Sequence, residues 1–142
     1  MNYWDTSALL KLFVSEPGSS DARGVLARDR EVATALLTYV EAFSAFTRRG
    51  QDGSLTRADL ARVRRRFAAE WTAYLRVPVT DEVVRRSRAA VERHGIRTLD
   101  AVHLASLLEL GERLGERIPL VAADGRLLQA ATAEGLRVIR TS

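Results

Sequence analysis

The 142-residue sequence predicts an α/β fold with three layers, α/β/α, around a mainly parallel central sheet of about five strands. Short apolar segments that suit buried strands alternate along the chain with longer segments whose apolar residues recur at helical spacing. The chain has no internal repeat, no low-complexity tract and no linker rich in proline, glycine or serine. We therefore expect residues 1–142 to form a single domain, which is long enough to bury one core.

Six elements are expected in the first half of the chain: strand Asn2–Trp4, helix Thr6–Val14, helix Ser19–Arg30, strand Glu31–Leu37, helix Thr38 to about Arg49, and helix Thr56–Leu75. The two strands are short and apolar, and Pro17 and Gly18 end the first helix. The large apolar residues of the last helix share one face: Leu60, Val63, Phe67, Trp71 and Tyr74.

Six more elements are expected in the second half: strand Arg76–Val79, helix Asp81–His94, helix Leu99–Leu114, strand Ile118–Ala123, helix Arg126–Glu134 and strand Leu136–Arg140. Pro78 interrupts the first of these strands and indicates a sheet edge, because proline cannot donate to the hydrogen bonds of a sheet. Gly95, Gly115 and Gly135 follow the three helices as stop signals. The helix over 99–114 is apolar nearly all round, which is typical of a buried helix.

The composition excludes several kinds of site. The absence of cysteine rules out thiolate metal sites, thiol nucleophiles and disulfides, and it is compatible with a reducing compartment. No signal-peptide pattern opens the chain, and no early apolar run approaches the roughly 20 residues of a transmembrane helix. We therefore expect a cytoplasmic protein that does not bind a membrane. Arginine supplies all but one of the 22 basic residues and suits phosphate, although arginine-rich coding bias explains this preference equally well.

Four acidic residues lie where a strand gives way to a helix or where a buried helix begins: Asp5, Glu41, Asp100 and Asp124. In a parallel sheet, all strand-to-helix junctions lie at the C-terminal ends of the strands. These carboxylates can therefore converge although they are far apart in sequence. Without cysteine, such a cluster is typical of a site for a hard cation, Mg²⁺ or Mn²⁺, rather than for zinc. The net charge of +4 attracts a polyanion, whose phosphates could approach the acids once a cation is bound.

Helix capping is an alternative role for three of these acids. Asp5 can accept backbone N–H bonds at the start of the first helix, and Asp124 can do the same for the last helix or form an Asp-Gly turn. Glu41 lies three residues after Thr38, which is the spacing of a capping box. Each of these three acids, taken alone, therefore has a structural explanation.

Asp100 is harder to explain by capping. It shares a face of its apolar helix with Leu104 and Leu107, and Thr98 is available to cap that helix. A buried carboxylate without a partner has a raised pKa or costs several kcal/mol, and a bound cation would resolve this conflict. Spacing alone does not select the set of four, because another acidic pair also follows a strand: Asp81 and Glu82.

Four segments, in order and over essentially the whole chain, resemble the sequence blocks of PIN-domain ribonucleases, in particular toxins of VapC type. They are Tyr3–Lys11 with Glu16–Ser19 after it, the helix of Glu41, Arg97–Ala105, and Ala123–Ala131. The first and third segments are distinctive, whereas a lone glutamate in a helix is a weak signal. One departure is Ala122, since the family often has a hydroxyl residue two positions before the fourth acid.

The resemblance implies a PIN-like fold and a divalent-metal-dependent endoribonuclease, the toxin component of a type II toxin-antitoxin pair. It implies that the four acids are catalytic and bind one or two Mg²⁺ or Mn²⁺ ions: Asp5, Glu41, Asp100 and Asp124. Glu41 would act partly through water, Ser7 would orient Asp5 or a water, and the products would end in 5′-phosphate and 3′-hydroxyl. The implied partners are an RNA substrate, a cognate antitoxin protein and a second copy of the chain.

Further residues have weaker assignments. Five arginines are predicted to guide RNA, although solvated helix faces explain them as well: Arg48, Arg49, Arg62, Arg65 and Arg66. His103 is interpreted as a buried, hydrogen-bonded histidine, and His94 as a helix-end residue. Two apolar stripes suit either a dimer interface or the core: Phe43 with Phe46, and Phe67 with Trp71. A non-catalytic nucleic-acid or protein-binding module on the same fold, with the acids as caps, is the alternative function.

Overall fold

The computed structural model describes residues 1–142 and contains a sheet of five parallel strands in the order β3-β2-β1-β4-β5. The strands are β1 (Asn2–Trp4), β2 (Val32–Ala35), β3 (Leu75–Val77), β4 (Leu120–Ala122) and β5 (Val138–Arg140). The central strand is β1. The next two strands in sequence, β2 and β3, lie on one side of it, and β4 and β5 lie on the other. The predicted α/β class and the five strands are confirmed, and the sheet is parallel throughout.

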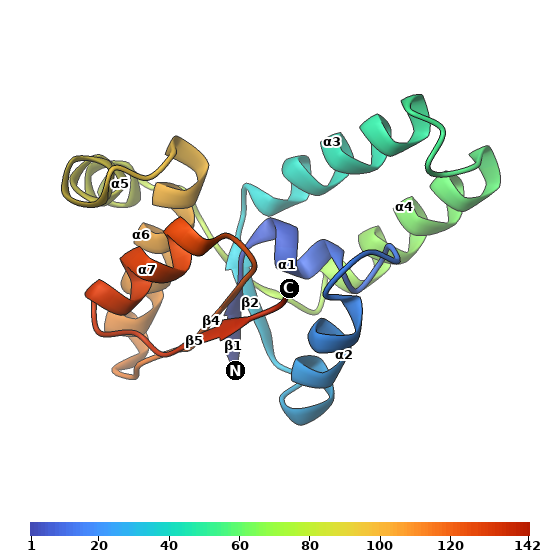
Figure 1. The fold of residues 1–142 in the computed structure, drawn as a ribbon. Coiled ribbons are helices and arrows are strands. Elements are labelled where there is room, and N and C mark those ends of the chain that lie inside the picture. Colours follow the sequence, from blue (N-terminus) through green and yellow to red (C-terminus); the bar gives the residue numbers. More distant parts are fainter.

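Seven helices cover the sheet: α1 (Thr6–Leu10), α2 (Ser19–Arg28), α3 (Thr38–Gln51), α4 (Arg57–Trp71), α5 (Asp81–His94), α6 (Thr98–Leu114) and α7 (Gly125–Ala133). Figure 1 shows the strands between two groups of helices, with α5, α6 and α7 on one side and α1 to α4 on the other. The three-layer prediction is therefore confirmed. None of the helices has the length and hydropathy needed to cross a membrane.

The three inner strands, β1, β2 and β4, are buried on both faces because each face packs against a helical layer. Successive residues of a strand point to opposite faces. Tyr3 and Leu120 belong to the apolar cluster that includes residues of α6 and α7, whereas Trp4 and Val121 belong to the cluster that includes residues of α1 to α4. All four side chains are fully buried. This burial on both faces explains why the strands appear in the sequence as short, nearly continuous apolar runs.

The long helices α3 and α4 pack against each other and extend together beyond the sheet (Figure 1). Their contact is aromatic. Phe46 and Phe67 are fully buried with ring centroids 5.7 Å apart, and Trp71 packs on Phe67 at the same separation. Phe43 is partly buried and lies edge-on to Phe67. Within the single chain these stripes therefore belong to the core, and a dimer interface on these helices stays a prediction.

Some element ends differ from prediction. The first helix ends at Leu10 instead of Val14, because the next residues form tighter turns with bonds between residues three apart. The helix α4 ends at Trp71, and Leu75 opens the following strand. That strand ends before Pro78 and forms one edge of the sheet, as its proline predicted.

Candidate active site

The sheet brings the four predicted acids to one cavity. Asp5 follows β1 and Asp124 follows β4, and these strands are parallel neighbours. Glu41 lies in the first turn of α3, which follows β2 on the other side of β1, and Asp100 lies in the first turn of α6. All four side chains line a cavity of about 670 Å³. Ligands of open α/β sheets bind at such a change of strand order, so the topology itself favours a site here.

Asp5 is the most buried of the four acids, with 4% of its surface exposed. Its Oδ1 accepts the backbone N–H of Ala8 at 2.8 Å and so caps α1, while Oδ2 accepts the Ser7 hydroxyl at 2.9 Å. Burial raises the pKa of Asp5, and the positive charge of His103 and these two bonds oppose the shift only in part. The Asp5 anion therefore lacks full compensation within the protein.

Glu41 does not form the predicted capping box. The residue at the cap of α3 is Leu37, and no side chain bonds the free N–H groups there. The Thr38 hydroxyl is used elsewhere, because it lies 2.7 Å from the Thr34 hydroxyl and 3.2 Å from that of Thr6. These buried hydroxyls join β2, α3 and α1 beneath the cavity, and they leave the Glu41 carboxylate free to face it.

The Glu41 carboxylate is bound by residues from two other helices. Its Oε1 accepts the Thr6 hydroxyl at 2.7 Å and lies 3.0 Å from Nε2 of His103. Burial alone would raise the pKa of Glu41, but the hydrogen bond and charge of His103 and the bond from Thr6 together lower it. Glu41 is therefore the acid of this cavity that the protein best stabilises as an anion.

Asp100 has no hydrogen-bond partner in the cavity. Arg97 occupies the cap position of α6 without a side-chain bond, so the expectation that Thr98 caps this helix is wrong. Burial, and next to it the negative charge of Asp124, raise the pKa of Asp100. Asp100 is thus a half-buried carboxylate without a hydrogen-bond partner, less buried than its position on an apolar helix predicted.

Asp124 caps the last helix and faces the cavity with its second oxygen. Oδ1 accepts the backbone N–H groups of Arg126 and Leu127 at 2.9 and 3.0 Å. Oδ2 lies 3.8 Å from a guanidinium nitrogen of Arg97. The capping interpretation of Asp124 is therefore confirmed, and it leaves one oxygen available to a ligand. Ala122, the departure from the resembled sequence pattern, is fully buried in the core.

The competing acidic pair lies outside the cavity. Asp81 is exposed in the first turn of α5, and the side chain that caps this helix is Thr80. Glu82 forms ion pairs with Arg85 and Arg86 at 2.8 and 3.1 Å. Because neither acid lines the cavity, the structure makes the selection that spacing alone could not make.

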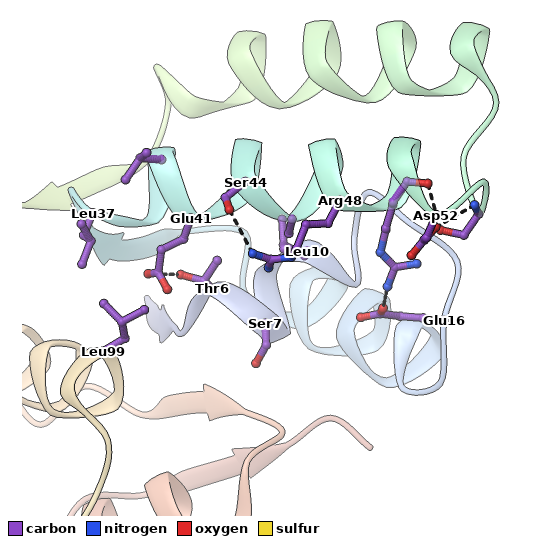
Figure 2. Close-up of a pocket in the computed structure, with 14 residues that line it drawn as sticks. Thr6, Ser7, Leu10, Glu16, Leu37, Glu41, Ser44, Arg48, Asp52 and Leu99 are labelled. Atoms are coloured by element: carbon purple, nitrogen blue, oxygen red, sulfur yellow. Dashed lines mark hydrogen bonds and ion pairs between the residues drawn. The ribbon is translucent and has the colours of Figure 1, made fainter.

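A second cavity of about 950 Å³ continues from the first and shares four residues with it: Thr6, Ser7, Glu41 and Leu99. Figure 2 shows Glu41, Ser44 and Arg48 projecting from the same side of α3 into this cavity. The Arg48 guanidinium donates to the Ser44 hydroxyl at 3.0 Å and is exposed. A groove therefore follows α3 from the acidic cavity to Arg48, and Glu16 and Asp52 line it near that arginine.

The five arginines predicted to contact nucleic acid fall into two groups. Arg48 and Arg49 line the groove, although Arg49 forms an ion pair with Glu16. The other three belong to α4 and line neither cavity: Arg62, Arg65 and Arg66. Two of these three form ion pairs within α4. The structure thus favours Arg48 among the five as a cation next to the acids.

Two residues that contact Glu41 in the cavity, Thr6 and His103, were not among the predicted site residues. Thr6 adjoins Asp5, and a hydroxyl next to the first acid is the signal that could have identified it. His103 is buried and hydrogen-bonded, as interpreted from the sequence, but it also lines the cavity. Its position three residues after Asp100 on one helix places both on the same face.

The donor set suits a hard cation, although the side chains are not grouped around one point. No three His, Asp or Glu side chains have the spacing of a single metal site. Oxygens of Asp5, Glu41 and Asp124 are bound by neighbouring donors. The raised pKa values of Asp5 and Asp100 nevertheless indicate negative charge without compensation, which carboxylate-binding cations such as Mg²⁺ relieve. Metal binding remains a prediction.

The chain is an α/β domain with an acidic cavity at the C-terminal ends of its strands, where the strand order switches. The PIN domain family model matches residues 3–134. The chain is 32% identical to Ribonuclease VapC45 of Mycobacterium tuberculosis over 136 residues, covering 96% of this chain and 92% of that protein. It is 33% identical to Ribonuclease VapC46 of the same organism over 140 residues, covering 99% and 97%. The chain therefore belongs to the PIN-domain family.

A solved structure shares the whole fold. A chain of a toxin-antitoxin complex from Klebsiella pneumoniae superposes with a TM-score of 0.69 at 16% sequence identity. The match covers 100% of this chain and 98% of that one. The order of strands and helices described above is therefore that of a known fold.

Proposed function

We propose that this protein is a divalent-metal-dependent endoribonuclease and the toxin component of a type II toxin-antitoxin pair. The observation that carries the proposal is the convergence of Asp5, Glu41, Asp100 and Asp124 on one cavity. Membership of the PIN-domain family and the ribonuclease names of the two relatives agree with it. Residues 1–142 would act as a single PIN-like domain.

The cofactor would be Mg²⁺ or Mn²⁺, bound by the four carboxylates. When bound, such an ion lowers the pKa of a water molecule and neutralises the charge of the phosphate to be cleaved. The protein itself fixes Asp5 through Ser7 and the N-terminus of α1, and it fixes Glu41 through Thr6. These contacts leave carboxylate oxygens directed at the cavity without requiring a side chain to act as nucleophile.

The RNA would lie in the groove along α3. Arg48 is an exposed cation there, and its planar guanidinium suits a phosphate near the acidic cavity. Arg49 lines the same groove but is paired with Glu16, so it would have to leave that pair to bind RNA. The arginines of α4 could contact only parts of an RNA that extend beyond the groove.

A cognate antitoxin, a homodimer and a cytoplasmic location complete the proposal. The similar Klebsiella structure is a toxin-antitoxin complex, which supports an antitoxin partner for this protein. Purification with the protein encoded by a neighbouring gene would test the antitoxin. Sedimentation velocity would measure whether the chain alone is a dimer.

The central test is cleavage of RNA by the purified chain. With Mg²⁺ or Mn²⁺ present, a mixture of structured RNAs should be cut at specific internal positions to leave 5′-phosphate ends. Chelation of the metal should stop the reaction, and readdition should restore it. Cleavage that persists in excess chelator would exclude the metal-dependent mechanism, and binding of RNA without any cleavage would favour a non-catalytic module.

A further inference from the structure

His103 is a buried residue that contacts the candidate site from within the core. Only 3% of its surface is exposed, and it is in the second turn of α6. Its Nδ1 lies 2.9 Å from the Tyr3 hydroxyl, and its Nε2 lies 3.0 Å from Oε1 of Glu41 and 3.1 Å from the Thr6 hydroxyl. The imidazole thus connects the central strand β1 to the carboxylate.

The direction of the hydrogen bond between the Tyr3 hydroxyl and Nδ1 of His103 sets which ring nitrogen carries the proton. Tyr3 is fully buried, and burial raises the pKa of its hydroxyl well above the usual value, so the hydroxyl keeps its proton. When this hydroxyl donates to Nδ1 of His103, a neutral ring must carry its proton on Nε2. That N–H then faces Glu41 and donates to the carboxylate.

The same arrangement leaves the other Glu41 oxygen free. Oε1 receives the Thr6 hydroxyl and faces Nε2 of His103, whereas Oε2 has no hydrogen-bond partner in the structure. Because two donors from different helices meet at Oε1, the carboxylate cannot rotate without breaking both bonds. Oε2 is therefore the oxygen that remains for a ligand in the cavity.

We propose that Tyr3 and His103 are positioning residues, which hold Glu41 with Oε1 bound and Oε2 presented to the cavity. The inference rests on the proposed ribonuclease function for its consequence but not for its geometry. His103 acts through Glu41, and Tyr3 acts through His103. Partners that orient metal-binding side chains typically contribute about 10- to 100-fold to activity or metal affinity.

The arrangement has a test that does not depend on activity. The chain has two histidines, so their ring nitrogens can be distinguished by long-range ¹⁵N–¹H NMR at about pH 8. We expect a proton on Nε2 of His103, where it faces Glu41, and we expect this preference to weaken in Tyr3→Phe. A ring with its proton on Nδ1 and none on Nε2 would overturn the proposal even if the protein cleaves RNA.

Kinetics of two substitutions test the consequence. In His103→Gln the amide nitrogen can reach the place of Nε2, whereas in His103→Asn the shorter side chain reaches only the place of Nδ1. We expect His103→Asn to lower kcat by about 10- to 100-fold with little change in KM, and His103→Gln to recover most of the loss. Equal activities of the two variants would contradict the positioning role.

A matched control separates positioning from stability. His94 forms a comparable pair with Glu134, its Nε2 lying 2.8 Å from Oε1, but outside the cavity. His94→Gln should change the melting temperature without changing kcat. If the activity of the His103 variants falls only because less of the protein is folded, and kcat of the folded protein is unchanged, the role of His103 is structural. A parent protein that cuts no RNA would refute the proposed function, while the NMR result would still decide the geometry.

Discussion

Asp100 and Asp124 begin successive helices, α6 and α7, and face the same cavity, where the charge of Asp124 adds to burial in raising the pKa of Asp100. The two carboxylates cannot form a hydrogen bond with each other when both are ionised, because an ionised carboxylate can only accept. Asp5 has a raised pKa in the same cavity, chiefly because of burial. The cavity thus holds carboxylates whose negative charge the protein does not fully compensate, and a bound cation would compensate it.

Removing this charge should stabilise the metal-free protein at neutral pH. A carboxyl with a raised pKa binds more protons folded than unfolded between its ordinary and raised values, so its cost to stability grows as pH rises through that interval. Asp5→Asn with Asp100→Asn should therefore melt roughly a few degrees above the parent at about pH 7, and the gain should vanish below about pH 4. Thermal unfolding in chelator measures both. Asp81→Asn is the control, because Asp81 is exposed, and it should give no such pH-dependent gain in stability.

Divalent metal should stabilise the parent but not that double variant. Saturation to about 100 times the dissociation constant adds about 2.7 kcal/mol to the free energy of unfolding. The effect should fade as pH falls through the raised pKa values of Asp5 and Asp100, because protonated carboxyls do not bind the ion. Calorimetry in Mg²⁺ at several pH values checks this. Equal metal effects on both proteins would place the ion elsewhere.

Arg48→Ala should weaken RNA binding and reduce its salt dependence. Loss of one phosphate contact lowers the slope of log affinity against log salt by about 1. Arg65→Ala is the matched control, because Arg65 is exposed on α4 outside the groove. Binding measured over a salt series with the inactive double variant would avoid cleavage of the probe. Identical slopes for the two substitutions would remove the groove as the path of the RNA.

Phe67→Ala should destabilise the protein strongly, because Phe67 is fully buried between α3 and α4. Truncating a buried phenylalanine typically costs about 3–5 kcal/mol. Phe43→Ala should cost less, since Phe43 is only partly buried. Urea unfolding measures both. Equal, small losses would mean that the α3–α4 pair does not hold its aromatic residues as core.

The sequence was sufficient for the fold, which follows from periodicity and from the geometry of parallel strands. It also indicated that carboxylates could converge, but the choice of these four acids over Asp81 and Glu82 depended on the resemblance to a known family. Asp5 and Asp124 follow paired strands, and Asp100 could be recognised as uncompensated because its helix is apolar. The partners of Glu41 could not be found in this way. They lie 35 and 62 residues away, and they override a local pattern that resembled a capping box.

His103 illustrates the same limit from the other direction. Its burial could be predicted from an apolar helix, but its contact with Glu41 depends on how α6 and α3 meet across the sheet edge. The local sequence pattern indicates which residues are buried. It does not indicate which buried polar groups contact each other in the folded chain. Tertiary packing therefore decided both the capping of α3 and the environment of its glutamate.

Cleavage of RNA by Asp5→Asn with Asp100→Asn tests the central claim most directly. Both changes nearly preserve side-chain shape, and asparagine caps a helix about as well as aspartate, so the variant should fold. In Mg²⁺ its cleavage rate should fall at least about 100-fold below the parent, since even supporting residues of metal sites contribute about 10- to 100-fold. A purified, folded double variant that cleaves at the parental rate would contradict the account.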